Sequence, residues 1–240
     1  GNSISLKPTQ TRSRKQAPMS HYYIGDPRNH GLKYNPFKAL VAPRPIAWVS
    51  SKSAAGVVNL APYSFFNAVA DTPPTIIFAP NNPRMGGGRK DTLVNIEETG
   101  QFVVNLCNYD LREAMNLSSA HVDPDVDEIE MAGLTPAPCN AVDVPRVLEA
   151  PAALECEFMF RTRLPSGHPK IENNVVFGKV VGIHITESIL NDGMVDMIAY
   201  EPLARLGYMD YSRVTEVFAM DRPDQDLDAY EAGKAKRAAE

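Results

Sequence analysis

Two stretches of this chain carry residue types that suit a phosphorylated, planar ligand. The first spans residues 84–92, where three consecutive glycines stand among Arg84, Arg89 and Lys90, just before a predicted helix. Glycines let the main chain approach an anion closely, the cations supply charge, and a helix N-terminus adds its dipole. This pattern indicates a phosphate-binding loop. A solvated basic loop before an ordinary helix is the alternative interpretation.

The second stretch is the aromatic segment at residues 59–67. Pro62 has no N–H for a sheet ladder, so we expect strand pairing to loosen there and to leave main-chain groups free beside flat apolar side chains. A planar heteroaromatic ligand needs that combination. The candidate contacts are Asn59, Ala61, Pro62, Tyr63, Ser64, Phe65 and Asn67. The alternative is that the aromatic side chains of this segment fill the protein core.

Other polar or aromatic residues near these stretches are weaker candidates. Ser50 and Ser51 have hydroxyls that can bind the same phosphate. Arg44 can neutralise ligand charge, although pairing with a surface carboxylate explains it equally well. Trp48 is more typical of a core residue than of a stacking platform. The histidines are scattered without ligand spacing, so we expect no metal site and a structural role for His184.

Composition limits the classes of partner and compartment. The chain has 240 residues, 44% of them hydrophobic, and a formal charge of -5. No basic patch stands out beyond the N-terminal arm, so we expect no nucleic acid partner. No apolar run is long enough to span a bilayer, so we expect no membrane association. The three cysteines have no CxxC spacing, which favours free thiols in the reducing cytoplasm.

Hydrophobic patterning predicts a mainly β chain with few helices. We expect strands at 44–52, 57–60, 75–79, 102–106, 154–162, 175–186 and 214–220, and helices at 91–98 and 111–120. The first two strands form a hairpin. In the fifth, Glu155, Glu157 and Arg161 are expected on a wet face. Gly178 and Gly182 within the sixth predict bends at barrel corners or close approach of another backbone.

These elements predict a small antiparallel β-barrel of Greek-key type with inserted helices. We expect a flexible arm at 1–20, the barrel domain at 21–222 and a charged tail at 223–240. A barrel of this size fills its interior with side chains, so a large cofactor must bind outside it. We expect that cofactor in a groove walled by a second subunit.

The chain also resembles a known family over about residues 22–223. The runs HGLKYNPFKALVAPRPIAWVSS, NLAPYSFFNAV and KDTLVNIEETGQFVVNL are similar to the flavin reductase-like proteins, which have the FMN-binding split-barrel fold. The resemblance implies FMN as cofactor and a homodimer. It implicates Lys90, Asp91 and Thr92 at the phosphate, and it allows His168 to reach a nicotinamide.

The resemblance implies an NAD(P)H:flavin oxidoreductase, in which hydride passes from nicotinamide to flavin when the two rings stack. Placement of the rings supplies most of that catalysis, so no nucleophile triad is needed. A monooxygenase that receives the reduced flavin is a further implied partner. Two alternatives stay open: an FMN electron carrier without nicotinamide activity, and a related barrel without flavin that serves as a binding module.

Overall fold

The computed structural model describes residues 22, 29–81 and 88–220 of the chain. The arm predicted at 1–20, the tail predicted at 223–240, and Arg84, Gly86 and Gly87 of the glycine-rich loop lie outside these residues. Among the described residues, no helix is long and apolar enough to cross a bilayer.

Seven antiparallel strands form the main sheet, which confirms the mainly β prediction. Their spatial order is β3-β2-β6-β9-β10-β5-β4. The bounds are β2 Ala47–Lys52, β3 Val58–Tyr63, β4 Phe66–Asp71, β5 Pro74–Phe78, β6 Gln101–Leu106, β9 Ala152–Leu164 and β10 Asn173–Ile185. Consecutive strands β5 and β6 are separated by β9 and β10, so the order is not that of a simple meander.

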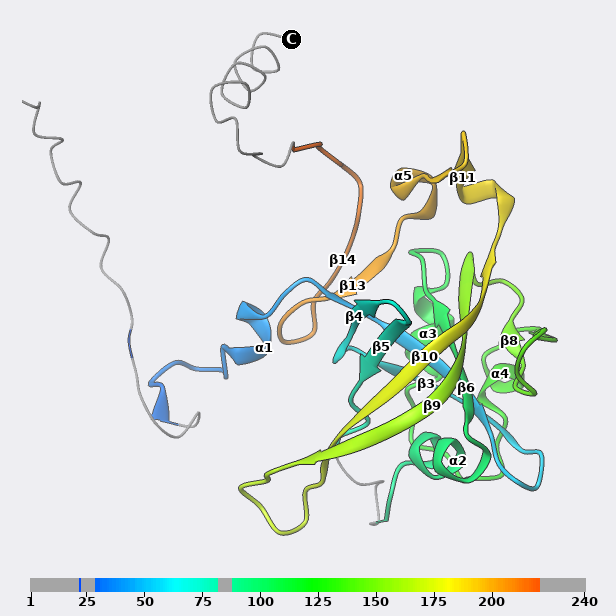
Figure 1. Cartoon of the computed structure of the whole chain (residues 1–240). Coiled ribbons are helices and arrows are strands. Elements are labelled where there is room, and N and C mark those ends of the chain that lie inside the picture. The colour runs from blue at the N-terminus through cyan, green and yellow to red at the C-terminus, as the bar shows by residue number, and fades with distance from the viewer. Residues whose placement is uncertain (1–21, 23–28, 82–87, 221–240) are drawn as a thin grey trace, which may run out of the picture.

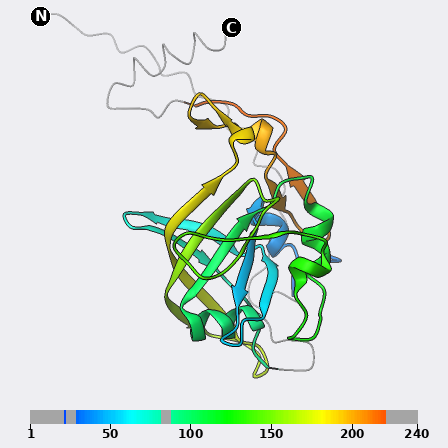
Figure 2. The same ribbon diagram turned by 90° about the vertical axis from the view of Figure 1, so that its right-hand side faces the viewer.

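The connection between β3 and β4 forces the sheet to curl. These strands are the two edges of the sheet, yet only Ser64 and Phe65 separate them in sequence. Seven strands laid flat would put the edges about 29 Å apart, whereas the three Cα–Cα steps from Tyr63 to Phe66 span at most roughly 11 Å. The edges therefore meet at this connection, and the sheet closes into the barrel seen in Figure 2.

The expected loosening of strand pairing at Pro62 does not occur. Trp48 remains paired with Pro62, and Ala47 with Tyr63 at the end of the strand. Because β3 is an edge strand, a residue without an N–H costs no ladder bond on its outer side. The next strand, β4, begins only two residues further on, where the sequence predicted a loop.

Side chains of β2 alternate between two cores. Ala47 and Val49 belong to the cluster that fills the barrel together with Phe78 and Phe102. Trp48 belongs to a second cluster between the barrel wall and two short helices. Strand β2 is thus buried on both faces, where the sequence predicted a half-buried strand.

The two glycines of β10 lie where the sequence predicted a special backbone. The β9–β10 ladder shifts register between Phe177 and Gly178 and again between Val180 and Gly182. A Cβ at Gly178 would overlap the Phe102 ring, and one at Gly182 would lie 3.1 Å from the Glu155 carboxyl carbon. The irregular backbone expected here is therefore present, whereas the predicted approach of another backbone is wrong, because the atoms nearest to both glycines belong to side chains.

Short elements cover the barrel. The helices are α1 Phe37–Leu40, α2 Asp91–Thr99, α3 Arg112–Leu117, α4 Glu128–Met131 and α5 Met197–Tyr200, with a 3-10 turn at Glu187–Ile189. Helix α2 lies across one end of the barrel (Figure 1) and ends at Gly100, whose φ of 74° suits glycine. Its N-cap is Lys90. The predicted helix at 111–120 is confirmed over the shorter span of α3.

The remaining strands are short, and one predicted strand is wrong. They are β1 Arg44–Pro45, β7 Pro136–Ala137, β8 Arg146–Val147, β11 Leu190–Asn191, β12 Met194–Val195, β13 Leu203–Arg205 and β14 Tyr211–Arg213. Residues 214–220 form no strand, although their apolar side chains have strand propensity. Phe218 is 82% exposed. Residues 214–220 pair with no strand in the part of the chain that the structure describes, so no inter-strand hydrogen bonds support their strand propensity.

Candidate functional site

The structure brings the two predicted stretches together in one hollow. Asn59, Ala61, Pro62 and Tyr63 of β3 face Lys90, Asp91 and Thr92 at the start of α2 across a cavity of about 100 Å³. We call this the β3–α2 hollow. Residues 118–122 and Glu128 complete its lining. The positive end of the α2 dipole lies here, and no side chain caps that end of the helix.

A chain of buried hydrogen bonds holds the hollow in shape. The Thr92 hydroxyl, which is 1% exposed, donates to Asn59 Oδ1 at 2.6 Å and accepts from the Tyr63 hydroxyl at 2.9 Å. Burial raises the pKa of Tyr63 well above its ordinary value, so this phenol stays protonated and can donate. Thr92 therefore fixes β3 against α2.

Glu128 continues this network from α4. Its carboxylate oxygens accept from Asn59 Nδ2 and from the backbone N–H of Leu60, each at 2.9 Å. Burial raises the pKa of Glu128 above its ordinary value, although both hydrogen bonds favour the charged form. The amide of Asn59 is thereby oriented, with its oxygen toward Thr92 and its nitrogen toward Glu128.

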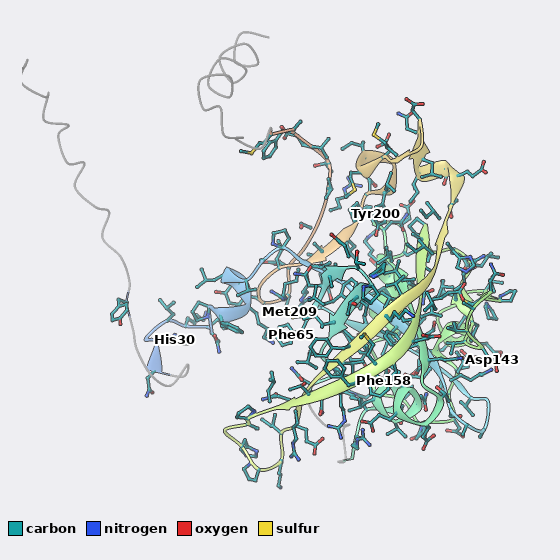
Figure 3. The ribbon with its side chains drawn as sticks, viewed as in Figure 1. His30, Phe65, Asp143, Phe158, Tyr200 and Met209 are labelled. Carbon is teal, nitrogen blue, oxygen red and sulfur yellow. The ribbon has the colours of Figure 1, made fainter. Side chains whose placement is uncertain are left out.

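A second, larger hollow includes in its lining the residues that follow β3 in the chain, beginning with Ser64. It has a volume of about 580 Å³, and we call it the Phe65 hollow. Four predicted residues line it: Arg44, Ser64, Phe65 and Asn67. Phe65 lies at the connection between β3 and β4 (Figure 3), directly after the residues of the β3–α2 hollow. The two hollows thus follow one another along a single stretch of chain.

Arg44 is buried and bound to main-chain oxygens. Its Nη1 donates to the carbonyls of Lys38 and Val41, the latter at 2.5 Å, and its Nη2 donates to the carbonyl of Leu206 at 2.9 Å. Its Nε is one of two buried side-chain polar atoms without a hydrogen-bond partner among the described residues. Arg44 therefore ties α1 to the C-terminal segment, while its guanidinium edge lines the Phe65 hollow.

Arg89 is placed on the other side of Lys90. It forms an ion pair with Glu97, which Arg161 shares. Arg89 and Lys90 line a separate cavity of about 230 Å³ together with Lys170 from the β9–β10 connection. Arg89 therefore does not enter the β3–α2 hollow.

Three predicted residues are wholly inside the protein. Trp48, Ser50 and Ser51 are each 0% exposed. Trp48 Nε1 donates to the Ser118 hydroxyl at 2.8 Å, Ser50 Oγ donates to the carbonyl of Pro145 at 2.7 Å, and Ser51 Oγ accepts from Asn95 Nδ2 at 3.1 Å. Since they present no surface to a ligand, we leave them out of the proposed contact set.

His168 and His184 have different surroundings. His168 is exposed in the loop between β9 and β10, where Nδ1 accepts from the N–H of Lys170 at 3.2 Å. His184 Nε2 lies 2.5 Å from Glu155 Oε1. The sulfur of Cys139 is within 4.8 Å of both groups.

Glu155 is the centre of that cluster and is 1% exposed, so the predicted wet face is wrong at this position. Burial pushes its pKa up, but hydrogen bonds from the backbone of Asn140, Ala141 and Val142 and from His184 outweigh burial and lower the pKa. The loop at 140–142 covers the strand, and strand alternation alone could not reveal it.

The sequence did not identify residues 118–122 or Glu128 as part of the site. Residues 118–120 belong to the predicted helix at 111–120, and Glu128 lies in a stretch for which no strand or long helix was predicted. The acidic cap at Asp127, which accepts from the N–H groups of Ile129 and Glu130, was the only local signal of structure there. It marks a helix start, and it does not indicate that the carboxylate of the next residue reaches β3.

The arrangement can bind an anion in one hollow and a flat group in the other. Lys90 and the start of α2 supply positive potential at one end. Ser64 and the rings of Phe65 and Phe66 supply a polar group and apolar surface in the Phe65 hollow. Binding and orientation of a ligand are the functions that this geometry supports.

Comparison with known proteins assigns the family. An uncharacterised protein of Halalkalibacterium halodurans is 38% identical over 185 residues, which cover 76% of this chain and 87% of that protein. The crystal structure of nitrilotriacetate monooxygenase component B from Bacillus cereus has a TM-score of 0.73 and 33% identity, and the match covers 84% of this chain and 100% of that one. The crystal structure of the Pseudomonas fluorescens 2-nitrobenzoate 2-nitroreductase has a TM-score of 0.68 and 32% identity, and the match covers 79% of this chain and 89% of that one.

The family match spans most of the barrel and both hollows. Residues 40–205 match the family described as the flavin reductase like domain. This span includes β3, the start of α2 and the residues that connect the two hollows, and it supports a flavin-binding role of the oxidoreductase type. The chain belongs to the flavin reductase-like family and has its split-barrel fold.

Proposed function

We propose that this protein binds FMN and acts as an NAD(P)H:flavin oxidoreductase. The observation that carries the proposal is the β3–α2 hollow, in which the NLAPY segment faces the Lys90-Asp91-Thr92 segment. A phosphorylated flavin requires an anion site and a planar apolar site within one molecule's length of each other. The two hollows follow one another along the chain and meet that requirement.

The phosphate is assigned to the end with Lys90 and the start of α2. Lys90 supplies a cation, and the α2 dipole favours negative charge at its N-terminus. At about 100 Å³ this hollow holds the phosphate tail and not the ring system, because small-molecule pockets generally need about 300 Å³ or more. The ring is therefore assigned to residues 61–67 and the Phe65 hollow.

FMN, when bound, accepts a hydride from NAD(P)H and passes its electrons on. The chain's own part is to hold the ring edge with main-chain groups of Ala61–Ser64 and to exclude water with Phe65 and Phe66. Asn67 lines the same hollow and has both a donor and an acceptor. Placement is sufficient for hydride transfer between stacked rings, so a proton-transfer residue is not required.

The Phe65 hollow is open to its surroundings, and we propose that a second subunit covers it. Strand β4 is an edge strand, and Val69 on it is 49% exposed. Exposed strand edges invite pairing or coverage by another chain. A homodimer would complete the ring site, and size-exclusion chromatography with light scattering tests it. A cytoplasmic location completes the proposal.

The identity of the electron acceptor rests on the relatives. One similar structure is named as a monooxygenase component, which supports delivery of reduced flavin to a monooxygenase partner. Another is named as a nitroreductase, which supports direct reduction of an organic acceptor. An FMN electron carrier without nicotinamide activity is the second candidate, and the experiment below separates it from the reductase.

The test is spectroscopic. Purified protein reconstituted with FMN should be yellow, and NADH or NADPH should bleach it in a stopped-flow experiment. If dithionite bleaches the flavin and neither nucleotide does, the reductase proposal is wrong and the carrier is favoured. If no FMN is retained, the flavin proposal itself fails.

A variant tests the phosphate assignment. Lys90→Gln should raise the Kd for FMN about tenfold because a cation beside a phosphate contributes about 1–2 kcal/mol. Riboflavin, which lacks the phosphate, should bind wild type and variant alike. Lys179→Gln is the control, since Lys179 is exposed on β10 beside Glu157, outside both hollows. Equal FMN affinity in Lys90→Gln and Lys179→Gln would remove Lys90 from the site.

A further inference from the structure

A pocket outside the two flavin hollows is built where the C-terminal hairpin docks onto the barrel. The N–H of Tyr109 donates to the carbonyl of Glu201 at 3.1 Å, and the N–H of Leu203 donates to the carbonyl of Cys107 at 3.0 Å. In the β13–β14 hairpin, Leu203 pairs with Arg213. These bonds bring the hairpin, with Met209 on its loop (Figure 3), against the start of α3.

We call the resulting cavity the Tyr109 pocket. Its volume is about 390 Å³, which lies in the range of sites for small organic molecules. Met115 and Leu203 are 2% and 5% exposed and give it an apolar floor. Its walls and rim are Tyr109, Arg112, Glu113, Asn116, Met209, Tyr211, Ser212 and Arg213. None of these residues lines the β3–α2 hollow or the Phe65 hollow.

Two arginines converge on one ring in this pocket. The guanidinium carbons of Arg112 and Arg213 each lie 4.0 Å from the centroid of the Tyr109 ring. The two cations are therefore separated by no more than twice that distance. Like charges this close repel each other, and an anion that contacts both relieves the repulsion.

The arginines keep donors for such an anion. Arg112 Nη1 donates to the carbonyl of Tyr109 at 2.9 Å, and Arg213 Nη1 lies 3.3 Å from the Glu201 carboxylate. For neither residue is a partner of Nη2 found among the described part of the chain. A guanidinium has five N–H donors in a planar fork, which suits a carboxylate.

One acidic residue opposes an anion at the rim. Glu113 Oε1 lies 3.5 Å from Arg112 Nε, and the Glu113 side chain is 82% exposed. Such an exposed pair contributes little, so a ligand can displace it. Glu113 thus competes weakly with a ligand anion for the Arg112 guanidinium. Removal of the Glu113 charge should therefore make an anion bind more tightly.

We propose that the Tyr109 pocket binds a small aromatic carboxylate, with its carboxylate at the guanidinium groups of Arg112 and Arg213 and its ring on the apolar floor. Two cations select the negative charge. The buried side chains of Met115 and Leu203 in the floor select an apolar body. The cavity volume suits a single-ring acid.

The experiment measures benzoate binding to the full chain by isothermal titration calorimetry, with benzamide as the neutral isostere. Benzoate should bind at least tenfold more tightly than benzamide, and its affinity should fall as salt increases because the contact is electrostatic. The measurement is made with and without saturating FMN. Competition between FMN and benzoate would place benzoate in the flavin site and overturn the proposal of a separate benzoate pocket. That result would leave the proposed FMN binding intact.

Variants assign the site. Arg213→Gln should weaken benzoate binding about tenfold and leave benzamide binding unchanged, whereas Glu113→Gln should tighten benzoate binding severalfold. Arg163→Gln is the control, because Arg163 is an exposed arginine paired with Glu172 on the β9–β10 arm. Benzoate affinity equal to that of benzamide, or unchanged in both Arg213→Gln and Glu113→Gln, overturns the proposal. If Arg213→Gln fails to fold, the comparison of benzoate with benzamide on wild type and Glu113→Gln still decides it.

Discussion

Replacement of Thr92 by Val tests the network that shapes the β3–α2 hollow. Valine has nearly the same volume and is also β-branched, so the change removes a hydroxyl and little else. That hydroxyl donates to Asn59 Oδ1 and accepts from the Tyr63 hydroxyl, and it is 1% exposed. The variant leaves a buried acceptor and a half-buried donor without partners.

The magnitude follows from those two groups. A buried polar group left without a hydrogen bond costs about 1–3 kcal/mol, and the added methyl recovers part of that by burial. We therefore expect Thr92→Val to lower the free energy of unfolding by about 2–3 kcal/mol. That is a large share of the roughly 5–15 kcal/mol by which domains are stable.

Urea denaturation followed by circular dichroism measures the effect. With an m-value of about 2 kcal/mol/M, the midpoint should fall by about 1 M. Thr99→Val on the same helix is the matched control, because its hydroxyl donates to the carbonyl of Asn95 at 2.8 Å within the helix and its loss should cost below about 1 kcal/mol. If Thr92→Val and Thr99→Val lower the free energy of unfolding by amounts within about 0.5 kcal/mol of each other, the role given to Thr92 is refuted.

Two further changes test packing and charge in the barrel. Gly178→Ala should destabilise the fold by about 1–3 kcal/mol because its Cβ overlaps the buried Phe102 ring. Gly167→Ala, whose Cβ meets no atom within 4 Å, should be nearly neutral. Equal unfolding midpoints for the two variants would contradict this prediction. Glu155→Gln should cost about 2 kcal/mol at pH 7. Hydrogen bonds lower the pKa of Glu155 in the folded state, so its contribution is present above the unfolded pKa of about 4.3 and lost as pH falls through the folded pKa. Wild type and variant should therefore converge in acid, and the exposed Glu157→Gln should show no such pH dependence.

Local patterns in the sequence predicted the parts of the fold that depend on near neighbours. The hairpin before Tyr63, the helix that ends at Gly100 and the alternating strand after Leu154 are all present. Each has its signal within about ten residues: a turn glycine, a C-terminal glycine, or a period of two. The runs around Asn59 and Lys90 predicted that both segments bind one ligand, and they do share a hollow.

What the sequence could not predict depends on contacts between distant segments. Glu155 looked like a solvent-facing residue because its neighbours alternate, but the loop at 140–142 covers it with three N–H donors. Residues 214–220 looked like a strand because their propensity is high, but they pair with no strand among the described residues. In both cases the structure of the residue depends on another segment of the chain. The periodicity or strand propensity of the local sequence contains no information about that segment.

The same reasoning explains why Ser50 and Ser51 are inside the protein although they follow the pattern of a surface strand. Strand β2 lies between β3 and β6, and its two faces are covered by the barrel core and by the layer of short helices. Its hydroxyls must therefore find protein partners, and they do, at Pro145 and Asn95. Edge strand β3 has one side without a strand partner, and it contributes Asn59, Ala61, Pro62 and Tyr63 to the lining of the β3–α2 hollow. The position of a strand in the sheet, and not its residue types alone, decides which of its polar side chains can take part in binding.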